Sequence, residues 1–329
     1  MNKTTYKYVL GVDIGNTKTL YALTRLDGTA LHILRGMGTN YQEIGQDEMV
    51  RRLRDGIAAI IKECGILKHD MAAIYYGAAG ADTPTDFQIL EKAFAQVAPG
   101  VPFDFENDGW IALHSGTLGQ AGMVVTCGTG NTNCAVNSTG ERLRIGGLSE
   151  FLGDVLGAYS IAAYAMQAAV RGEDGRDDPT ILSTLIPRAL NVETNADVIN
   201  LEVTSELVKK VVETFFDAAQ QGDGRSLNIC WMLVKEVLNI VREFYNGLFQ
   251  QEKFFKLVLD GTVFRQKYQP LTRMLELALR QKYNVEIIIP DYDPVVGAIF
   301  LAFKHAGCPL DKRCAKQIIK TYKSVEIRE

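Results

Sequence analysis

One short motif occurs twice in the chain, and it constrains the fold more than any other feature. Residues 12–19 read Val-Asp-Ile-Gly-Asn-Thr-Lys-Thr, and residues 127–133 read Cys-Gly-Thr-Gly-Asn-Thr-Asn. Each copy follows an apolar, strand-like run, Tyr8 to Ile14 or Met123 to Cys127, and leads into a second such run. The repeat predicts two similar domains, each with a glycine-containing hairpin turn.

The length of the chain supports this division into two domains. At 329 residues the sequence exceeds what a single hydrophobic core usually covers. Its hydrophobic share of 47% and charged share of 22% are those of an ordinary folded protein with enough apolar residues for two cores. We expect an N-terminal domain over residues 1–118 and a C-terminal domain over residues 119–329. Whether the C-terminal helix packs back near the hinge between them stays open.

Charge and hydropathy argue against several classes of protein. The 35 basic and 39 acidic residues give a net charge of −4, without the cationic excess that holds the phosphate backbone of nucleic acids. The first residues, Met1 to Lys7, are polar, and the apolar run that follows is only as long as a strand, so neither a signal peptide nor a membrane span fits. We expect a cytoplasmic protein with no nucleic-acid partner and no membrane partner.

The cysteine and histidine residues do not form a metal-binding pattern. No pair among the six cysteines has the two-residue gap of zinc or redox motifs, and the four histidines are scattered. Disulfides are not expected in a reducing cytosol. For Cys127, at the start of the second glycine turn, we expect a small buried strand residue. The alternative for this residue is a ligand of an iron–sulfur cluster.

Apolar periodicity predicts an α/β fold with a helical insertion in the second domain. Strand-like and helix-like runs alternate in the first domain, as in the helix expected over Asp47 to Cys64 and the strand expected over Met71 to Tyr76. From about residue 160 to residue 250 strand signals nearly vanish and helical patterns replace them. The other expected helices are Thr85 to Val97, Ile161 to Val170, Val198 to Ala219, Ser226 to Phe249 and Pro294 to Phe303. The other expected strands are Leu20 to Leu26, Val101 to Phe105, Cys134 to Val136, Phe254 to Leu259 and Val285 to Ile289.

The first glycine turn offers groups that suit an anion. Gly15 lets backbone N–H groups approach phosphate oxygens without a Cβ in the way, Thr17 offers a hydroxyl, and Lys18 offers charge. Asp13, at a strand end beside that anion, would repel it unless Mg²⁺ intervened, so we expect Asp13 to hold Mg²⁺ through water. Taken alone, the turn is better explained by a plain hairpin in which Gly15 and Asn16 serve the turn geometry.

The second turn repeats these groups, and the repetition favours phosphate binding over plain hairpins. Gly128 and Gly130 permit close backbone approach, while Thr129 and Asn131 can form hydrogen bonds with β- and γ-phosphates. Two such turns on two domains would hold a nucleoside triphosphate from both sides, and phosphoryl transfer depends mainly on position and charge neutralisation. The sequence therefore predicts a phosphate-transferring enzyme whose domains close during turnover.

Asp108 is the predicted catalytic base. It follows the strand expected to end at Phe105, at a strand-to-helix junction where carboxylates of α/β active sites often project. A carboxylate there can accept the proton of an attacking hydroxyl as the γ-phosphoryl group departs in line. The alternative is that Asp108 caps the helix expected from Gly109 to Leu113, because Asp is a favoured N-cap residue.

Five ordered motifs resemble those of the actin-like ATPase and sugar kinase superfamily. The two glycine turns resemble its two phosphate loops, and Asn107 and Asp108 stand where the first connecting segment carries its acidic residue. Residues 259–264 resemble the adenosine motif, and Pro294 to Ala298 resembles the second connecting helix. The resemblance spans nearly the whole chain and implies a two-domain actin-like (ribonuclease H-like) α/β fold that uses ATP and Mg²⁺.

Within the superfamily, the chain is similar to N-acetylglucosamine kinases and the related BadF/BadG/BcrA/BcrD ATPases. This similarity lies in residues 146–148 (Gly-Gly-Leu), residues 151–154 (Phe-Leu-Gly-Asp) and the pair Ala158 and Tyr159. It implies a small-molecule sugar substrate and a homodimer.

The resemblance also implies which residues bind the nucleotide and the sugar. The nucleotide-binding residues are Asp13, Gly15, Asn16, Thr17, Lys18, Gly128, Thr129, Gly130, Asn131, Asp260, Gly261 and Thr262. The sugar-binding residues are Asn40, Asn107, Asp108, Gly147, Leu148 and Asp154. Asparagine and aspartate suit vicinal hydroxyl groups because both accept hydrogen bonds and asparagine also donates them.

Three positions depart from the family pattern. Val155 stands where an acidic residue is usual and Leu156 where glycine is usual, so we expect an altered wall of the sugar pocket. Asp260 stands where glycine is commoner in the adenosine motif, which bears on nucleotide preference. The identity of the sugar and the need for an N-acetyl group therefore stay open.

The predicted function is an ATP-dependent carbohydrate kinase. It transfers the γ-phosphoryl group to a hydroxyl, with O6 expected, of N-acetylglucosamine or a related amino hexose. Two alternatives remain from other functional classes. One is an ATPase that activates a radical dehydratase through a cluster bound by Cys127, and the other is a non-catalytic sugar or nucleotide sensor.

Overall fold

The computed structural model describes residues 7–29 and 31–328. Of the polar start considered above, Met1 to Lys7, only Lys7 falls within them. The chain divides into two compact units. Unit 1 comprises the residues up to Gln120 together with those from Pro290 onward, and unit 2 comprises Ala121 to Ile289.

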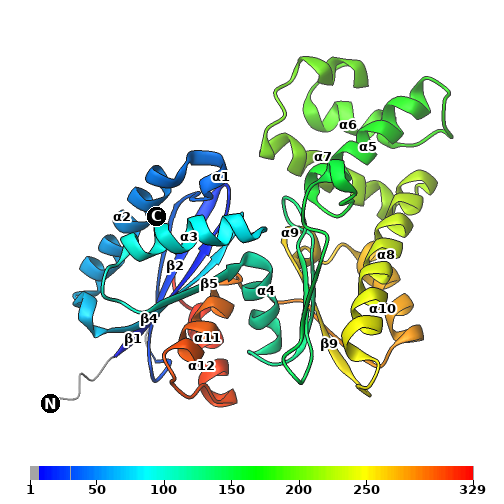
Figure 1. Ribbon diagram of the computed structural model, residues 1–329. Coiled ribbons are helices and arrows are strands. Elements are labelled where there is room, and N and C mark those ends of the chain that lie inside the picture. Colours follow the sequence, from blue (N-terminus) through cyan, green and yellow to red (C-terminus); the bar gives the residue numbers. More distant parts are fainter. Residues whose placement is uncertain (1–6, 30, 329) are drawn as a thin grey trace, which may run out of the picture. The chain divides into compact units, whose positions relative to one another are not determined.

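Unit 1 contains a mixed sheet of five strands in the order β3-β2-β1-β4-β5 (Figure 1). The strands are β1 (Tyr8–Ile14), β2 (Lys18–Arg25), β3 (Leu31–Met37), β4 (Met71–Ala78) and β5 (Phe103–Asn107). The β1, β4 and β5 strands run parallel, while β2 is antiparallel to both of its neighbours. The carboxyl ends of β1, β3, β4 and β5 consequently meet at one end of the sheet, called here the carboxyl edge of unit 1.

Helices cover both faces of this sheet, as Figure 1 shows. Alternation along β1 directs Leu10 and Val12 into a core with α2 (Gln46–Cys64) and α3 (Pro84–Val97). Val9 points the other way, into a core with α11 and α12. The remaining helices of unit 1 are α1 (Tyr41–Ile44), α4 (Asp108–Thr117), α11 (Val295–His305) and α12 (Lys312–Tyr322).

The segment from Pro290 onward groups with unit 1, whereas the sequence analysis placed all residues after 118 in the second domain. The reason is a close approach of α11 to the sheet and to α4. A Cβ at Gly297 would lie 1.9 Å from the carbonyl oxygen of Ile111, and one at Gly11 would lie 2.7 Å from the backbone nitrogen of Ile299. Such long-range packing of glycines leaves no periodic signal in the sequence.

Unit 2 repeats the strand order and directions of unit 1. Its sheet has the order β8-β7-β6-β9-β10, in which β6, β9 and β10 are parallel and β7 is antiparallel to both neighbours. The strands are β6 (Gly122–Thr126), β7 (Asn133–Val136), β8 (Arg142–Ile145), β9 (Phe255–Asp260) and β10 (Val285–Ile288). The shared topology confirms the similarity of the two halves that the repeated hairpin predicted.

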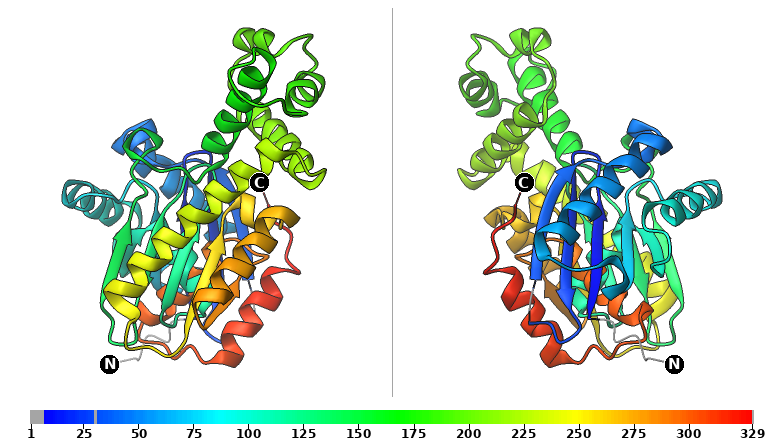
Figure 2. Two further views of the ribbon diagram at one scale, coloured as in Figure 1. Left: turned by 90° about the vertical axis from the view of Figure 1, so that its right-hand side faces the viewer. Right: turned by 90° about the vertical axis from the view of Figure 1, so that its left-hand side faces the viewer.

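The helical insertion of unit 2 separates β8 from β9, and its first helices form the green projection in Figure 2. Its helices are α5 (Ala158–Glu173), α6 (Leu182–Leu190), α7 (Ser205–Gln220) and α8 (Gly224–Phe244), and α8 continues into a π-helical turn (Tyr245–Phe249). Two further helices of unit 2 are α9 (Thr262–Arg265) and α10 (Gln269–Lys282). The α/β class with a helical insertion is thus confirmed.

Several elements differ from the expectation. The helix predicted over Val198 to Ala219 begins only at Ser205, because Thr204 caps it and a separate 3₁₀ segment covers Asn195 to Asn200. The short helix predicted after Asp108 runs on to Thr117. The β3 and β8 strands and the α6, α10 and α12 helices were not predicted from the sequence.

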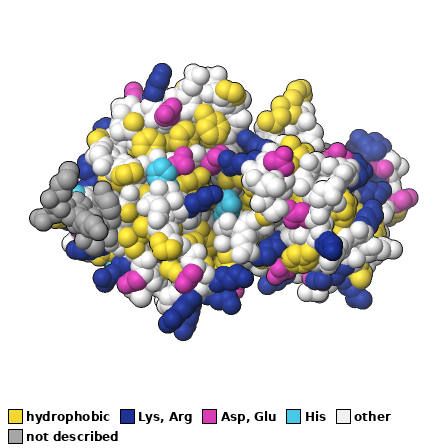
Figure 3. Space-filling view, turned by 60° about the horizontal axis from the view of Figure 1, so that its bottom comes forward, with side chains coloured by type: hydrophobic (Ala, Val, Ile, Leu, Met, Phe, Trp, Pro, Cys, Tyr) yellow, Lys and Arg dark blue, Asp and Glu magenta, His cyan; other side chains and the backbone are white. Residues whose placement is uncertain are grey.

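Surface composition matches the nearly balanced charge of the sequence. Figure 3 shows basic, acidic and hydrophobic side chains interspersed over one face of the molecule. Among the residues that the structure describes, no helix combines the length and apolar character needed to cross a membrane.

Candidate functional site

The predicted residues of unit 1 gather at its carboxyl edge. The parallel register aligns Ile14, Ala78 and Asn107, the last residues of β1, β4 and β5. The antiparallel register aligns Lys18, the first residue of β2, with Met37, the last residue of β3. The first glycine turn, the segment containing Asn40 and the start of α4 therefore lie at the same end of the sheet, although they are distant in sequence.

The first glycine turn is held by its own backbone and by the segment after β3. The backbone N–H of Gly15 donates to the carbonyl of Lys18 at 3.0 Å, which closes the hairpin, and the N–H of Thr39 donates to the carbonyl of Gly15 at 3.1 Å. The side-chain amide of Asn40 donates to the Oδ1 of Asn16 at 2.8 Å. A Cβ at Gly38 would lie 1.9 Å from the carbonyl oxygen of Asn16, so only glycine fits there.

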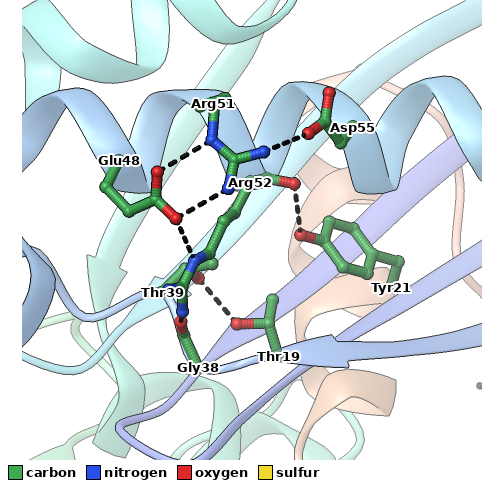
Figure 4. A network of polar contacts seen from close by, with 8 residues as sticks. All are labelled: Thr19, Tyr21, Gly38, Thr39, Glu48, Arg51, Arg52 and Asp55. Carbon is green, nitrogen blue, oxygen red and sulfur yellow. Dashed lines mark hydrogen bonds and ion pairs between the residues drawn. The ribbon is translucent and has the colours of Figure 1, made fainter.

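A second network fixes the segment after β3 from the side of α2, as Figure 4 shows. The guanidinium of Arg52 donates to the carbonyl of Gly38 at 2.9 Å and to Glu48 at 2.7 Å. The buried hydroxyls of Thr19 and Thr39 lie 2.6 Å apart. Hydrogen bonds from Arg51 and Arg52 lower the pKa of Glu48 to about 2, so this carboxylate remains ionised over the whole physiological range.

Lys18 has a fixed partner inside unit 1. Its Nζ lies 3.1 Å from Oδ1 of Asp293, whose Oδ2 accepts a hydrogen bond of 2.6 Å from the hydroxyl of Tyr322. The Lys18 side chain is still 40% exposed. Its ammonium is thus held at the start of β2 with one side open to solvent.

Asn107, and not Asp108, caps helix α4. The Oδ1 of Asn107 accepts a hydrogen bond of 3.0 Å from the backbone N–H of Gly109, and Asn107 is 3% exposed. Asp108 is the first residue of α4 and is partly buried. The alternative interpretation of Asp108 as the helix cap is therefore wrong, because its neighbour fills that position.

The predicted residues of unit 2 gather in the same way. Thr126 and Asp260, the last residues of β6 and β9, are paired, and Asn133 at the start of β7 is paired with Ile145 at the end of β8. The second glycine turn follows Thr126 directly. We call this end the carboxyl edge of unit 2.

The second glycine turn is packed by backbone on several sides. The N–H of Cys127 donates to the carbonyl of Asp260 at 2.7 Å, and the N–H of Ala158 donates to the carbonyl of Gly128 at 2.8 Å. A Cβ at Gly261, where φ is +99°, would lie 2.4 Å from the carbonyl oxygen of Cys127. A Cβ at Gly157 would lie 2.9 Å from the carbonyl oxygen of Thr129. This packing leaves no room for side chains at Gly157 and Gly261.

The sugar-binding residues predicted for unit 2 contact one another. The carboxylate of Asp154 accepts hydrogen bonds from the backbone N–H groups of Gly147 at 3.0 Å and of Leu148 at 2.6 Å. The side chain of Leu148 is 64% exposed. Leu156, expected to alter the pocket wall, is 2% exposed and belongs to the hydrophobic core of unit 2. The departure at position 156 is therefore accommodated inside the unit.

Asp260 is buried and paired within its own motif. Its side chain is 3% exposed, and its Oδ1 accepts a hydrogen bond of 2.8 Å from Nε of Arg265 in α9. The pairing neutralises a carboxylate that would otherwise be costly to bury.

A pocket of about 250 Å³ lies within unit 2 beside the second glycine turn. Thr129 and Thr262, both predicted to bind nucleotide, are part of its wall. The other lining residues are Ala158, Tyr159, Ser205, Val208, Lys209, Val212, Glu213, Val263, Gln266 and Tyr268. The wall combines apolar residues with polar and charged side chains, and such a mixture can bind and orient a small molecule. The sequence alone does not reveal this pocket, because the apolar residues of α7 look like ordinary core positions.

Cys127 is a core residue, as expected. It is 1% exposed, and burial raises the pKa of its thiol to about 12. Its place in the core of unit 2 agrees with the small buried residue expected at this position.

The carboxylate of Asp13 is chemically suited to bind magnesium. It lies at the end of β1, beside the first turn, and is partly buried. Among residues 7–29 and 31–328, no group of three or more metal-binding side chains comes together. Mg²⁺ prefers few protein carboxylates together with phosphate oxygens and water, so the donor set agrees with an ion that arrives with a nucleotide.

Known families and proteins resemble this chain over most of its length. The model of the BadF/BadG/BcrA/BcrD ATPase family matches residues 10–302. The chain is 29% identical to an N-acetylmuramic acid/N-acetylglucosamine kinase from Clostridium acetobutylicum, over 90% of this chain and 98% of the relative. It is 26% identical to an N-acetyl-D-glucosamine kinase from Dictyostelium discoideum, over 89% and 97% of the two chains.

Solved structures share the fold. One from Chromobacterium violaceum, named as a candidate N-acetylglucosamine kinase, superposes with a TM-score of 0.71 at 22% identity, over 91% of this chain and 99% of the other. A glucokinase of the ROK family from Streptomyces griseus superposes with a TM-score of 0.58 at 15% identity, over 90% and 98%. These likenesses confirm the two-domain fold of the actin-like ATPases and sugar kinases.

Proposed function

From its membership of the BadF/BadG/BcrA/BcrD ATPase family, to which the chain belongs, we propose that this protein is an ATP-dependent amino-sugar kinase. It transfers the γ-phosphoryl group of ATP to the O6 hydroxyl of N-acetylglucosamine or a related amino hexose. Support comes from two curated kinases of N-acetylglucosamine, each aligned over about nine tenths of this chain.

One observation carries the proposal beyond this similarity. The carboxyl edge of unit 1 carries the first glycine turn together with three residues predicted to bind the sugar, Asn40, Asn107 and Asp108. Asn40 even contacts that turn directly, through Asn16. A binding site for hydroxyl groups next to a phosphate-binding turn is the arrangement that a kinase requires.

Both glycine turns contribute to ATP binding in this proposal. The first offers backbone N–H groups and the ammonium of Lys18, and the second offers N–H groups and the hydroxyl of Thr129. The pocket beside Thr129 and Thr262 supports a place for the nucleoside. Mg²⁺, held by the phosphates and through water by Asp13, would neutralise part of the phosphate charge.

Asp108 acts as the base in the transfer. Its carboxylate accepts the O6 proton of the sugar while O6 forms a bond to the γ-phosphorus atom. The bond from this phosphorus atom to the bridging oxygen breaks, and ADP leaves with the electron pair. Asn40 and Asn107 orient the sugar from unit 1, and Gly147, Leu148 and Asp154 are its proposed contacts in unit 2. The expected homodimer is also part of the proposal.

A panel of acceptors tests this function. ADP release is measured with and without Mg²⁺ in the presence of glucose, glucosamine, N-acetylglucosamine, N-acetylmannosamine and N-acetylmuramic acid. We expect Mg²⁺-dependent release that is stimulated most by an N-acetylated amino hexose. A flat response over the whole panel would contradict a sugar kinase and leave an ATPase or a sensor.

A further inference from the structure

One carboxylate that was not part of any sequence motif contacts the predicted sugar-binding residues of unit 1. Asp82 lies in the loop of residues 79–83 between β4 and α3, at the carboxyl edge of unit 1. Its Oδ1 accepts a hydrogen bond of 3.1 Å from Nδ2 of Asn107. Twenty-five residues separate the two partners in sequence.

This contact fixes the orientation of the Asn107 amide. The amide can turn by 180° and exchange its oxygen and nitrogen at little steric cost. One end, Oδ1, accepts from the N–H of Gly109 and caps α4, and the other end, Nδ2, donates to Asp82. A carboxylate only accepts hydrogen bonds here, so it selects the orientation in which the oxygen faces the helix. Asp108, between Asn107 and Gly109, takes its position from this cap.

The loop that carries Asp82 is itself anchored. The N–H of Ala79 donates to the carbonyl of Ile14 at 3.0 Å, and the N–H of Asp82 donates to Oδ2 of Asp86 at 3.2 Å. The carboxylate of Asp86 also accepts hydrogen bonds from Tyr41 and Thr83. Asp82 is thus supported from β1 and from the start of α3.

The same loop touches the other acceptor residue of unit 1. Gly80 has a φ of +85°, and a Cβ there would lie 2.6 Å from Oδ1 of Asn40. The side-chain amide of Gln42 donates to the carbonyl of Gly80 at 3.3 Å. Residues 79–83 therefore link the Asn40 segment to the start of α4.

We propose that Asp82 is a positioning residue of the acceptor site. It orients the amide of Asn107, and through this cap it holds Asp108 in the geometry for accepting the sugar proton. The inference rests on the proposed kinase function. It adds a residue on the sugar-binding side of the site, where Asp82 accepts the hydrogen bond from Asn107.

Three variants test the inference, with the acceptor that the wild-type enzyme prefers. Asp82→Ala removes the carboxylate, and Asp82→Ser is a second truncation should the first fail to fold. Asp82→Asn keeps an oxygen that can accept from Asn107. Asp104→Ala is the matched control, because Asp104 lies on the same strand as Asn107 with its side chain 54% exposed.

The readouts are kcat and KM for the acceptor and, separately, the dissociation constant of ADP. Asp82→Ala and Asp82→Ser should lower kcat/KM for the acceptor by on the order of 10- to 100-fold. ADP binding should stay within about twofold, and Asp82→Asn should restore kcat/KM to within about threefold of wild type. Asp104→Ala should behave as wild type.

Several results would overturn the inference. Truncation variants as active as wild type would remove Asp82 from the site. An Asp82→Asn variant as impaired as the truncations would mean that the charge acts directly, and weakened ADP binding would mean a general structural role. A wild-type protein that phosphorylates no acceptor would instead refute the proposed function, and the role of Asp82 with it.

Discussion

The two glycine turns share the sequence Gly-Asn-Thr, yet they are held by different kinds of contact. In unit 1, side chains add to the backbone contacts at Gly38: Asn40 donates to Asn16, and Asp293 pairs with Lys18. In unit 2, the turn is enclosed by backbone at Gly157 and Gly261, where a Cβ would collide with the loop.

Because of this difference, we expect substitutions in unit 1 to affect mainly activity and substitutions around the turn of unit 2 to affect mainly stability. At the carboxyl edge of unit 1, Lys18 and Asp108 are partly exposed and can be changed without disturbing a core, whereas Asn40 and Asn107 are buried. The glycines around the turn of unit 2 are part of its packing, so changing them should unfold the loop before it affects any chemistry.

The largest effect on activity is expected in unit 1, from Asp108→Asn. An amide cannot accept the sugar proton, so kcat should fall by on the order of 10²- to 10⁴-fold. The helix cap belongs to Asn107, so the melting temperature should stay near that of wild type. Steady-state kinetics together with ADP titration check this, and undiminished kcat would remove Asp108 from the mechanism.

The largest effect on stability is expected in unit 2, from Gly261→Ala. The added Cβ would lie 2.4 Å from backbone atoms of Cys127, in a conformation with φ of +99° that disfavours side chains. We expect a loss of on the order of 3 kcal/mol in the free energy of unfolding. Chemical denaturation measures it.

Gly130→Ala is the matched control for this substitution. No atom lies within 4 Å of a Cβ built at Gly130, so the stability should change by less than about 1 kcal/mol. The affinity for ATP should nevertheless fall, because the methyl group would stand where the backbone approaches phosphate. A Gly261→Ala variant as stable as Gly130→Ala would break the comparison between the two turns.

A moderate effect on nucleotide binding is expected from Lys18→Met. Loss of one charged contact to phosphate should raise KM for ATP by on the order of 10-fold. The ion pair with Asp293 is partly exposed, so the free energy of unfolding should change by less than about 1 kcal/mol. An unchanged KM for ATP would mean that Lys18 pairs with Asp293 and does not contact the nucleotide.

The smallest effect concerns acid stability in unit 1. Burial raises the pKa of Asp86, but hydrogen bonds from Tyr41 and Thr83 outweigh burial and hold the pKa below its usual value. This depressed pKa contributes stability above the unfolded-state pKa, which is lost as the pH falls through the folded-state value. Unfolding free energies between pH 6 and pH 3 should decline less steeply for Asp86→Asn than for wild type, and equal slopes would exclude this contribution.

Local patterns were sufficient to predict most of the fold. The hairpin strands and the helix from Asp47 to Cys64 follow from alternation and periodicity within a few residues, and the structure has them as β1, β2, β6, β7 and α2. The grouping of the last forty residues with unit 1 did not follow, because it depends on the fit of Gly11 and Gly297 against distant backbone.

In the candidate site, too, contacts between residues distant in sequence could not be predicted from local patterns. Motifs located the two glycine turns, Asn40 and Asn107, and the register of the sheets brings each set to one edge. Asp82 and Asp293 had no motif, since their partners are 25 and 275 residues away in sequence. The pocket beside Thr129 was missed because a helix that lines a pocket has the same apolar period as one that lines a core.

The proposed reaction is transfer of the γ-phosphoryl group of ATP to an amino hexose. Phosphorus NMR of the wild-type protein with ATP, Mg²⁺ and N-acetylglucosamine tests it directly. The account predicts a phosphomonoester signal coupled to the two protons at C6 of the sugar, growing in equal amount with ADP. Release of inorganic phosphate without any sugar phosphate would contradict it.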